Sequence, residues 1–157
     1  MKVIFPDLPI TRMNPEKGDR CFEIMSPFRF VINRDLLEIP VGFYTDWATT
    51  GPAASIISPI DPQICRPALA HDFLYFTGYG GSQAVCDEFL EAAMDAEGAG
   101  WLKRRIVFLG VSIAGTVVWK MYRQSVKYTL QKSIYSTAAG QPLLLMQVAE
   151  WNREVKQ

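Results

Sequence analysis

A break of five residues between two helical segments constrains the fold of this chain more than any other sequence feature. The break is Gly-Tyr-Gly-Gly-Ser at 78–82, and the apolar spacing on either side of it predicts helices at about 65–77 and 83–97. Glycines end helices because they adopt left-handed backbone angles that other residues avoid. A connection this short returns the second helix along the first, so we expect an antiparallel helical hairpin.

The only histidine of the chain, His71, lies in the first of these helices and directly precedes Asp72. With Tyr79 as the pivot, His71 comes eight residues before it and Asp87 eight residues after it, so the hairpin would place these two side chains at the same height. Asp87 could then orient the imidazole. Asp72 lies about 100° further around the helix and would face another partner, such as a metal ion.

A histidine beside an acid has two interpretations. An imidazole takes up and releases protons near neutral pH, and a nearby acid can hold it in one tautomer, which is typical of hydrolytic sites. The same pair on a helix can equally be a hydrogen-bonded structural anchor. The pair alone favours neither interpretation.

The rest of the chain predicts a single α+β domain, mostly helical, over residues 1–157. We expect an extended proline-bearing arm at 1–20 and a small antiparallel β-meander at 21–44. An ordered loop at 45–64 and a helical part at 65–157 should follow. In the helical part the hairpin is followed by two further helices, at about 101–131 and 141–155, the first bent near Gly110 or Gly115.

Composition and charge argue against a nucleic-acid partner, a disulfide framework and a zinc site. Sixteen basic and sixteen acidic residues cancel, which leaves no net field to attract nucleic acid. The basic cluster at 103–105 is typical of a solvated helix start rather than a phosphate clamp. Three widely spaced cysteines predict neither a disulfide framework nor a zinc site, and they fit a reducing compartment.

Two apolar segments near the C-terminus suggest packing surfaces. The run at 106–119 has 14 residues, short of the roughly 20 that cross a bilayer, so we expect a buried core helix and no membrane span, with membrane association as the weaker alternative. Its glycines would permit close helix packing. The segment 141–155 carries apolar residues at helical spacing, a stripe typical of core or oligomer contacts, at Leu144, Leu145, Val148 and Trp151.

Three ordered blocks of this sequence resemble an uncharacterised family of tailed-phage and prophage proteins, a domain of unknown function. In this chain the blocks read IPVGFYTDWATTGP, RPALAHDFLY and CDEFLEAAM, and the resemblance covers roughly residues 36–112. The corresponding pattern of the family is Gly-Phe-x-Thr-Asp-x-Ala-Ser/Thr, His-Asp-x-Leu-Tyr, and Ala-Asp-x-x-Phe followed by Met. The matching positions are Gly42, Phe43, Thr45, Asp46, Ala48, Thr49, His71, Asp72, Leu74, Tyr75, Asp87 and Met94. The chain departs from the pattern at Cys86, Leu90 and Gln83, and these changes leave the polar set whole. The resemblance implies a phage protein made in the host cytoplasm, with incorporation into the virion left open.

A looser resemblance is to small secreted calcium-dependent phospholipases, which share a His-Asp-x-x-Tyr helix and pair its histidine with an aspartate of a neighbouring helix. By this resemblance His71 would activate water, and Asp87 would orient the imidazole of His71. Asp72, with the loop at 45–52, would hold calcium. The disulfides and the glycine-rich loop of those enzymes are absent from this sequence, so the likeness suggests roles and no substrate.

Two hypotheses from different classes therefore stay open. In the first, the protein is a metal-assisted hydrolase of an ester or amide bond in the host envelope, with a divalent cation, calcium rather than zinc, and no organic cofactor. In the second, it is a non-enzymatic component of a phage tail or tail tip, whose partners are other virion proteins or further copies of itself. For the hydrolase, the catalytic residues would be His71 and Asp87. The metal ligands would be Asp72 and Asp46, and the supporting residues would be Thr45, Tyr75 and Thr49.

Overall fold

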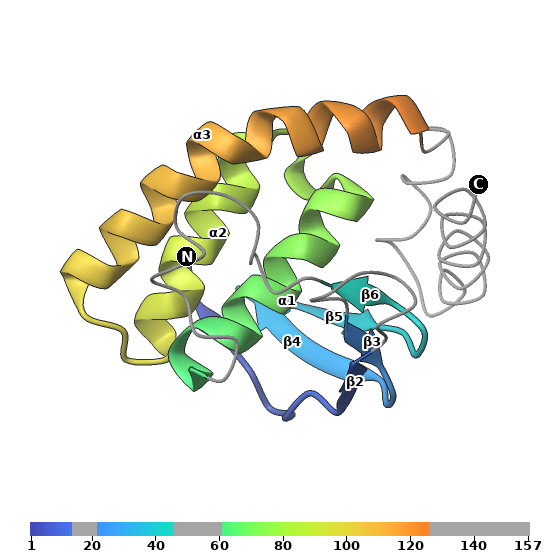
Figure 1. The fold of residues 1–157 in the computed structure, drawn as a ribbon. Coiled ribbons are helices and arrows are strands. Elements are labelled where there is room, and N and C mark those ends of the chain that lie inside the picture. Colours follow the sequence, from blue (N-terminus) through green and yellow to red (C-terminus); the bar gives the residue numbers. More distant parts are fainter. Residues whose placement is uncertain (14–21, 46–60, 126–157) are drawn as a thin grey trace.

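The protein has an α+β fold in which short strands pack on one side of a helical hairpin. The computed structural model describes residues 1–13, 22–45 and 61–125. Within these residues, a third long helix runs along the edge of the molecule opposite the strands (Figure 1). The strands are β1 (Val3–Ile4), β2 (Thr11–Met13), β3 (Phe22–Ile24), β4 (Phe28–Ile32), β5 (Asp35–Ile39) and β6 (Tyr44–Thr45). The helices are α1 (Pro62–Thr77), η3 (Tyr79–Gly81), α2 (Gln83–Ala96) and α3 (Trp101–Ser125). The predicted fold class is confirmed.

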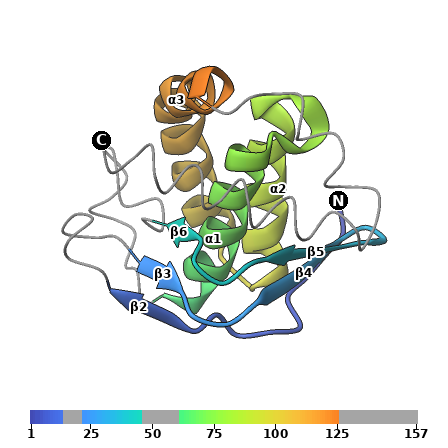
Figure 2. The same ribbon diagram turned by 90° about the vertical axis from the view of Figure 1, so that its right-hand side faces the viewer.

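The strands form two small antiparallel sheets, in the orders β1-β4-β5 and β2-β3-β6 (Figure 2). The longest strand, β4, follows the two-residue period of a half-buried strand, because Phe28, Phe30 and Ile32 are buried and the residues between them are more exposed. The turn after β4 contains Asn33, whose φ of 57° lies in the left-handed region that asparagine tolerates. The predicted meander is thus divided between two sheets.

The prediction of a separate arm at 1–20 is wrong for its described part. Val3 pairs with Ile32 of β4, and Thr11 pairs with Ile24 of β3, so this segment contributes one edge strand to each sheet. Both strands are short because Pro6 and Pro9, which lack an N–H group, lie between them. Residues 14–20 lie outside the described part of the chain.

The helical hairpin forms as the sequence predicts. Gly78 ends α1 with a φ of 73°, and its N–H donates to the carbonyl of Leu74 at 2.8 Å. Gly80 and Gly81 also have positive φ, which explains why the turn needs glycines. Ser82 then caps α2, and its side chain accepts from the Val85 N–H.

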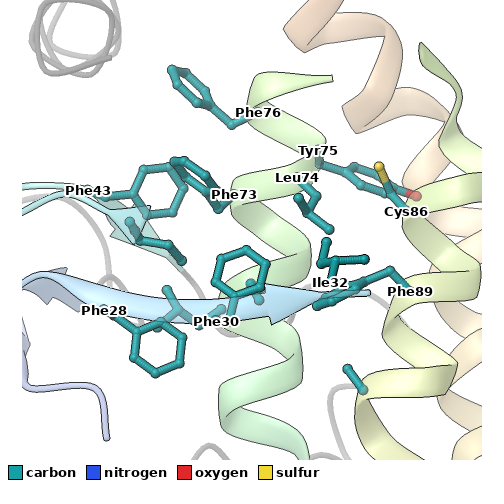
Figure 3. Close-up of a cluster of buried hydrophobic side chains, with 14 of the residues drawn as sticks. Phe28, Phe30, Ile32, Phe43, Phe73, Leu74, Tyr75, Phe76, Cys86 and Phe89 are labelled. Atoms are coloured by element: carbon teal, nitrogen blue, oxygen red, sulfur yellow. The ribbon is translucent and has the colours of Figure 1, made fainter. Parts of the chain in front are cut away.

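The core between strands and hairpin is dominated by phenylalanine (Figure 3). Phe30 of β4 contacts Phe73 of α1 edge-on, at 6.4 Å between ring centroids, and Phe89 of α2 at 5.7 Å. Phe43 also meets Phe73 edge-on, at 5.5 Å. Such pairs contribute about 0.5–1.5 kcal/mol each beyond their burial. This cluster fixes the hairpin against the sheets and so positions the polar residues of its other side.

Helix α3 is anchored at its start by three ion pairs. The basic residues at 103–105 bind acids of the N-terminus of α1 and of α2, in the pairs Lys103–Asp61, Arg104–Asp95 and Arg105–Glu91. The partially exposed pairs each add at most about 1 kcal/mol, but together they fix the start of the helix. The cluster is thus engaged with carboxylates of its own chain.

The prediction that α3 is a buried core helix is wrong for most of its surface. Residues Trp101–Arg123 form a helix long and apolar enough to cross a membrane by length and composition, with only 11% of the apolar window buried. The helix nevertheless packs one face on α1 and α2, where Val107 is buried. Length and composition do not by themselves place such a helix in a bilayer.

Close packing of α3 on the hairpin depends on Gly115. A Cβ atom added at this position would overlap the hydroxyl of Tyr75. The helix continues without interruption through Gly110 and Gly115 from Trp101 to Ser125. The sequence prediction that a glycine permits close helix approach here is therefore confirmed for Gly115.

We expect Gly115→Ala to lower the free energy of unfolding by about 1–3 kcal/mol, because the added methyl group must displace Tyr75 or α3. This loss should appear although alanine favours a helix over glycine by roughly 1 kcal/mol. Urea denaturation would measure it. Gly100→Ala is the matched control, since a Cβ there meets nothing within 4 Å, and an equal loss in both variants would contradict the packing argument.

Candidate functional site

The carboxylate of Asp87 is the centre of a polar cluster between the three helices. Its Oδ1 accepts from the Tyr75 hydroxyl at 2.5 Å and lies 3.1 Å from Nε2 of His71. Its Oδ2 accepts from Gln83 Nε2 at 3.3 Å and from the Ser112 hydroxyl at 3.2 Å. The side chains come from α1, α2 and α3, so one buried carboxylate joins all three helices.

His71 is held by Asp87 on one side and faces Asp72 on the other. Asp87 is 3% exposed and His71 is 3% exposed. Because an ionised carboxylate can only accept, Nε2 of the imidazole must carry a proton and donate it. In the neutral ring Nδ1 is then a bare acceptor. Nδ1 is buried, makes no hydrogen bond among the described residues, and lies 4.0 Å from Oδ1 of Asp72.

Asp72 connects this cluster to the sheet layer. The Thr45 hydroxyl at the end of β6 donates to Oδ2 of Asp72, while Oδ1 is directed toward His71. The Asp72 side chain is 18% exposed, whereas that of Asp87 is 4% exposed. The two acids therefore differ in their surroundings. Asp87 is buried and accepts hydrogen bonds at both oxygens, whereas Asp72 is partly exposed to solvent.

Electrostatics favour an ion pair between His71 and Asp87. Burial lowers the pKa of His71, but the carboxylates of Asp72 and Asp87 outweigh it and raise that pKa above its ordinary value of 6.5. Burial raises the pKa of Asp87, but hydrogen bonds from His71 and Tyr75 and the histidine charge outweigh it and lower that pKa below 3.8. Burial and the Asp87 charge both raise the pKa of Tyr75, so its hydroxyl remains a donor.

Aromatic and cationic contacts hold Tyr75 in place. Its ring lies 4.1 Å from that of His71, between centroids, and meets Trp119 of α3 edge-on at 5.4 Å. Arg123 lies over the Trp119 ring at 4.5 Å and donates to the backbone carbonyls of Tyr75 and Phe76. The C-terminal part of α3 thus fixes the end of α1.

The described cysteines have a structural setting. Cys65 and Cys86 are both free thiols. Burial raises the pKa of Cys65, and burial together with the nearby Asp87 raises the pKa of Cys86 to about 12. Neither thiol is therefore a reactive thiolate or a ready metal ligand at neutral pH. Cys21 lies outside the described residues.

Sequence reasoning placed only part of this cluster. The structure brings His71 and Asp87 together, as the hairpin argument predicts, and it gives Tyr75 and Thr45 the donor contacts proposed for supporting residues. It also adds three residues without a predicted role, Gln83, Ser112 and Thr116. Sequence spacing is the signal that could have found them. Gln83 lies four residues before Asp87, and Ser112 and Thr116 lie four residues apart within an apolar run.

The proposed metal ligands can be followed only in part. Asp46 and Thr49 lie outside the described residues. Among residues 1–13, 22–45 and 61–125, no group of three metal-binding side chains of the His, Cys, Asp and Glu type occurs. Asp72 supplies one carboxylate. Its oxygen chemistry suits a hard cation such as calcium, but calcium takes six to eight oxygen ligands, so the described donors are too few to define a site.

A family model described as "Protein of unknown function (DUF1353)" matches residues 22–111, more than half of the chain. The chain belongs to this family. The matched range includes the four side chains of the histidine cluster, His71, Asp72, Tyr75 and Asp87, and ends one residue before Ser112. The expected domain of unknown function is therefore confirmed. No curated protein and no solved structure matches the chain significantly.

We expect Tyr75→Phe to lower the free energy of unfolding by about 1.5–3 kcal/mol, because it removes a hydrogen bond to a buried charge. The ring would keep its packing against Trp119, so the loss isolates the hydroxyl. Chemical denaturation would measure it. A stability of Tyr75→Phe equal to that of wild type would show that the bond to Asp87 contributes little.

The ion pair should give stability a defined pH window. The contribution of His71, whose pKa is raised, is fully present below pH 6.5 and is lost as pH rises through its folded-state value. That of Asp87, whose pKa is lowered, is present above pH 3.8 and is lost as pH falls through its folded-state value. Denaturation across this range should show a maximum between the two limits. In His71→Gln the decline on the alkaline side should disappear, and its persistence would assign the decline to another group.

Proposed function

We propose that this protein is a hydrolase of ester or amide bonds in which His71 activates a water molecule. The observation that supports this most is the Nδ1 atom of His71, which is buried, lacks a hydrogen-bond partner among the described residues and faces Asp72. Buried polar atoms almost always have a partner, and ordered water commonly provides it. A network built only for stability would be expected to satisfy this atom.

The geometry suits general-base catalysis. Asp87 keeps a proton on Nε2, so the lone pair of the neutral ring is on Nδ1. A water beside Nδ1 and Oδ1 of Asp72, which are 4.0 Å apart, could donate one hydrogen to each and keep its oxygen lone pair for a carbonyl carbon. His71 would take a proton from the water as its oxygen bonds to the carbonyl carbon, and would return that proton to the departing oxygen or nitrogen as the ester C–O or amide C–N bond breaks. Asp87 would stabilise the imidazolium that forms.

A divalent cation remains part of the proposal without any step depending on it. When bound near Asp72, calcium would polarise the carbonyl of the substrate. The further oxygen ligands would come from outside the described residues, with Asp46 as the first candidate. Phage origin and a substrate in the host envelope rest on the sequence resemblance.

The second candidate is a structural component of a phage virion. Its supporting observations are the sealing of His71 and Asp87 and the four contacts that saturate the Asp87 carboxylate. A saturated buried network specifies how helices pack without any reaction. The exposed apolar surface of α3 also suits a protein that is packed against others.

Asp72→Asn separates the two candidates, because Asp72 lies outside the Asp87 contacts and the change keeps the side chain's shape. For a hydrolase we expect activity on a chromogenic ester or anilide to fall by about 10²-fold or more. Stability should change little above the folded-state pKa of His71, where the ring is neutral and gains nothing from the Asp72 charge. Asp95→Asn, at a side chain that is 66% exposed, is the control and should keep full activity. Calcium should raise the melting temperature of wild type but not of Asp72→Asn. Inactive wild type without a calcium shift would favour the virion component.

The rate of hydrolysis should rise with pH over the range in which the His71 contribution to the free energy of unfolding falls. His71 must be neutral to accept a proton, and its pKa is raised above 6.5, so the rate should increase as pH rises through the folded-state value. Initial rates measured together with unfolding curves on the same samples would show both trends. A rate that is flat across this range would exclude His71 as the base.

A further inference from the structure

We propose that Gln83 is a positioning residue that keeps the Asp87 carboxylate ionised, so that a proton taken up by His71 stays on the imidazole. The catalytic meaning of this inference rests on the proposed hydrolase, whereas its structural part can be tested without any activity. Gln83 is the first residue of α2. It acts through Asp87, because its Nε2 donates to Oδ2 of that carboxylate at 3.3 Å.

Gln83 differs from the other partners of Asp87 in that it can only donate. The hydroxyls of Tyr75 and Ser112 can rotate and accept, and Nε2 of His71 accepts once it has lost its proton. A protonated Asp87 could therefore donate to any of these three. The amide nitrogen of Gln83 has no lone pair to offer, so it opposes a proton on Oδ2.

Helix α3 fixes the orientation of the Gln83 amide. Nε2 also donates to the backbone carbonyl of Ser112 at 3.0 Å, and Oε1 accepts from the Thr116 hydroxyl at 3.1 Å. An amide turned by half a rotation would place Oε1 against two acceptors, the Ser112 carbonyl and Oδ2 of Asp87. A backbone carbonyl can never donate, so the amide nitrogen must face it. The backbone of α3 thus determines that a donor points at Asp87.

A donor held at Oδ2 favours the charged form of Asp87 at both oxygens. Hydrogen bonds to an ionised acceptor are roughly twice as strong as those to a neutral one, so a proton moving onto Oδ1 would weaken the Gln83 bond. The proton that could make this move is the one on Nε2 of His71, which lies 3.1 Å from Oδ1. If the amide were removed, the partner left at Oδ2 among the described residues would be the Ser112 hydroxyl, which accepts as readily as it donates.

In the proposed reaction, this constraint matters while the ring is an imidazolium. The oxygen of the water bonds to the carbonyl carbon as one of its protons moves to Nδ1, so that both ring nitrogens of His71 carry protons. If Nε2 then passed its proton to Asp87, the ring would be neutral, and a neutral imidazole is a much weaker acid. It would not readily return the Nδ1 proton to the departing oxygen or nitrogen as the C–O or C–N bond breaks. Gln83 therefore keeps His71 an effective acid for the leaving group.

Nitrogen NMR of the ring tests the structural part, because His71 is the only histidine of the chain. Its pKa lies above 6.5, so below pH 6.5 both ring nitrogens of wild type should be protonated. Gln83→Met keeps the length of the side chain and removes the amide. In this variant the Nε2 signal should shift toward that of an unprotonated nitrogen, while Nδ1 stays protonated. Gln83→Ala takes its place if Gln83→Met does not fold.

Gln83→Lys is the matched variant, because an ammonium group also only donates. It should keep the ring spectrum of wild type. A change in Gln83→Lys as large as that in Gln83→Met would contradict the argument from donor direction.

Kinetics test the catalytic part. In Gln83→Met we expect kcat on a nitroanilide to fall about tenfold or more with little change in KM, because the aniline nitrogen must be protonated to leave. A nitrophenyl ester, whose leaving group departs as an anion, should lose much less. A purely structural role would lower both rates equally.

Two further results would overturn the role of Gln83. One is a ring spectrum of folded Gln83→Met that is identical to that of wild type. The other is an equal loss of kcat on the ester and the anilide. A wild type without activity, together with the expected shift in Gln83→Met, would contradict the hydrolase and support the action of Gln83 on the ring.

Discussion

The burial of one carboxylate, Asp87, is the constraint on which the helical part of this structure depends. An isolated charge in the interior costs several kcal/mol, so it persists only with donors on every side. Here they come from His71 and Tyr75 of α1, from α2 itself, and from Ser112 of α3. Moving any of the three helices would leave that charge short of a donor. The cluster therefore specifies the helix packing as strongly as the phenylalanine core specifies the packing of strands.

The same cluster contains the features of a reaction centre and those of a rigid anchor. Its Asp87 end is sealed and fully hydrogen-bonded, which alone would suggest an anchor. Its other end has an imidazole nitrogen without a partner among the described residues, beside the partly exposed Asp72. A sealed acid that orients a histidine and a second acid closer to solvent is a division of roles that hydrolytic sites use. This asymmetry, together with the Nδ1 atom of His71 that has no partner among the described residues, is what supports the proposal of a hydrolase.

Local signals made much of the fold predictable. The glycine-rich turn at 78–82 determined the hairpin, and the hairpin determined the meeting of His71 and Asp87. The strands that the sequence did not predict depend on pairing with residues far away in the chain. Val3–Ile4 and Thr11–Met13 are too short to show a strand period. They are strands because they pair with β4 and β3. Likewise Ser112 could be noticed in its apolar run, but no local rule says that its hydroxyl reaches Asp87 on α2.

The adjacency of His71 and Asp72 has a consequence for α1 as a rigid body. These neighbours project about 100° apart around the helix axis, and each is held from a different layer, one by Asp87 of α2 and the other by Thr45 of β6. Only one angular setting of α1 about its own axis satisfies both contacts. A displacement of the end of β6 would therefore remove the contact of Thr45 with Asp72, while the imidazole stays bound to Asp87.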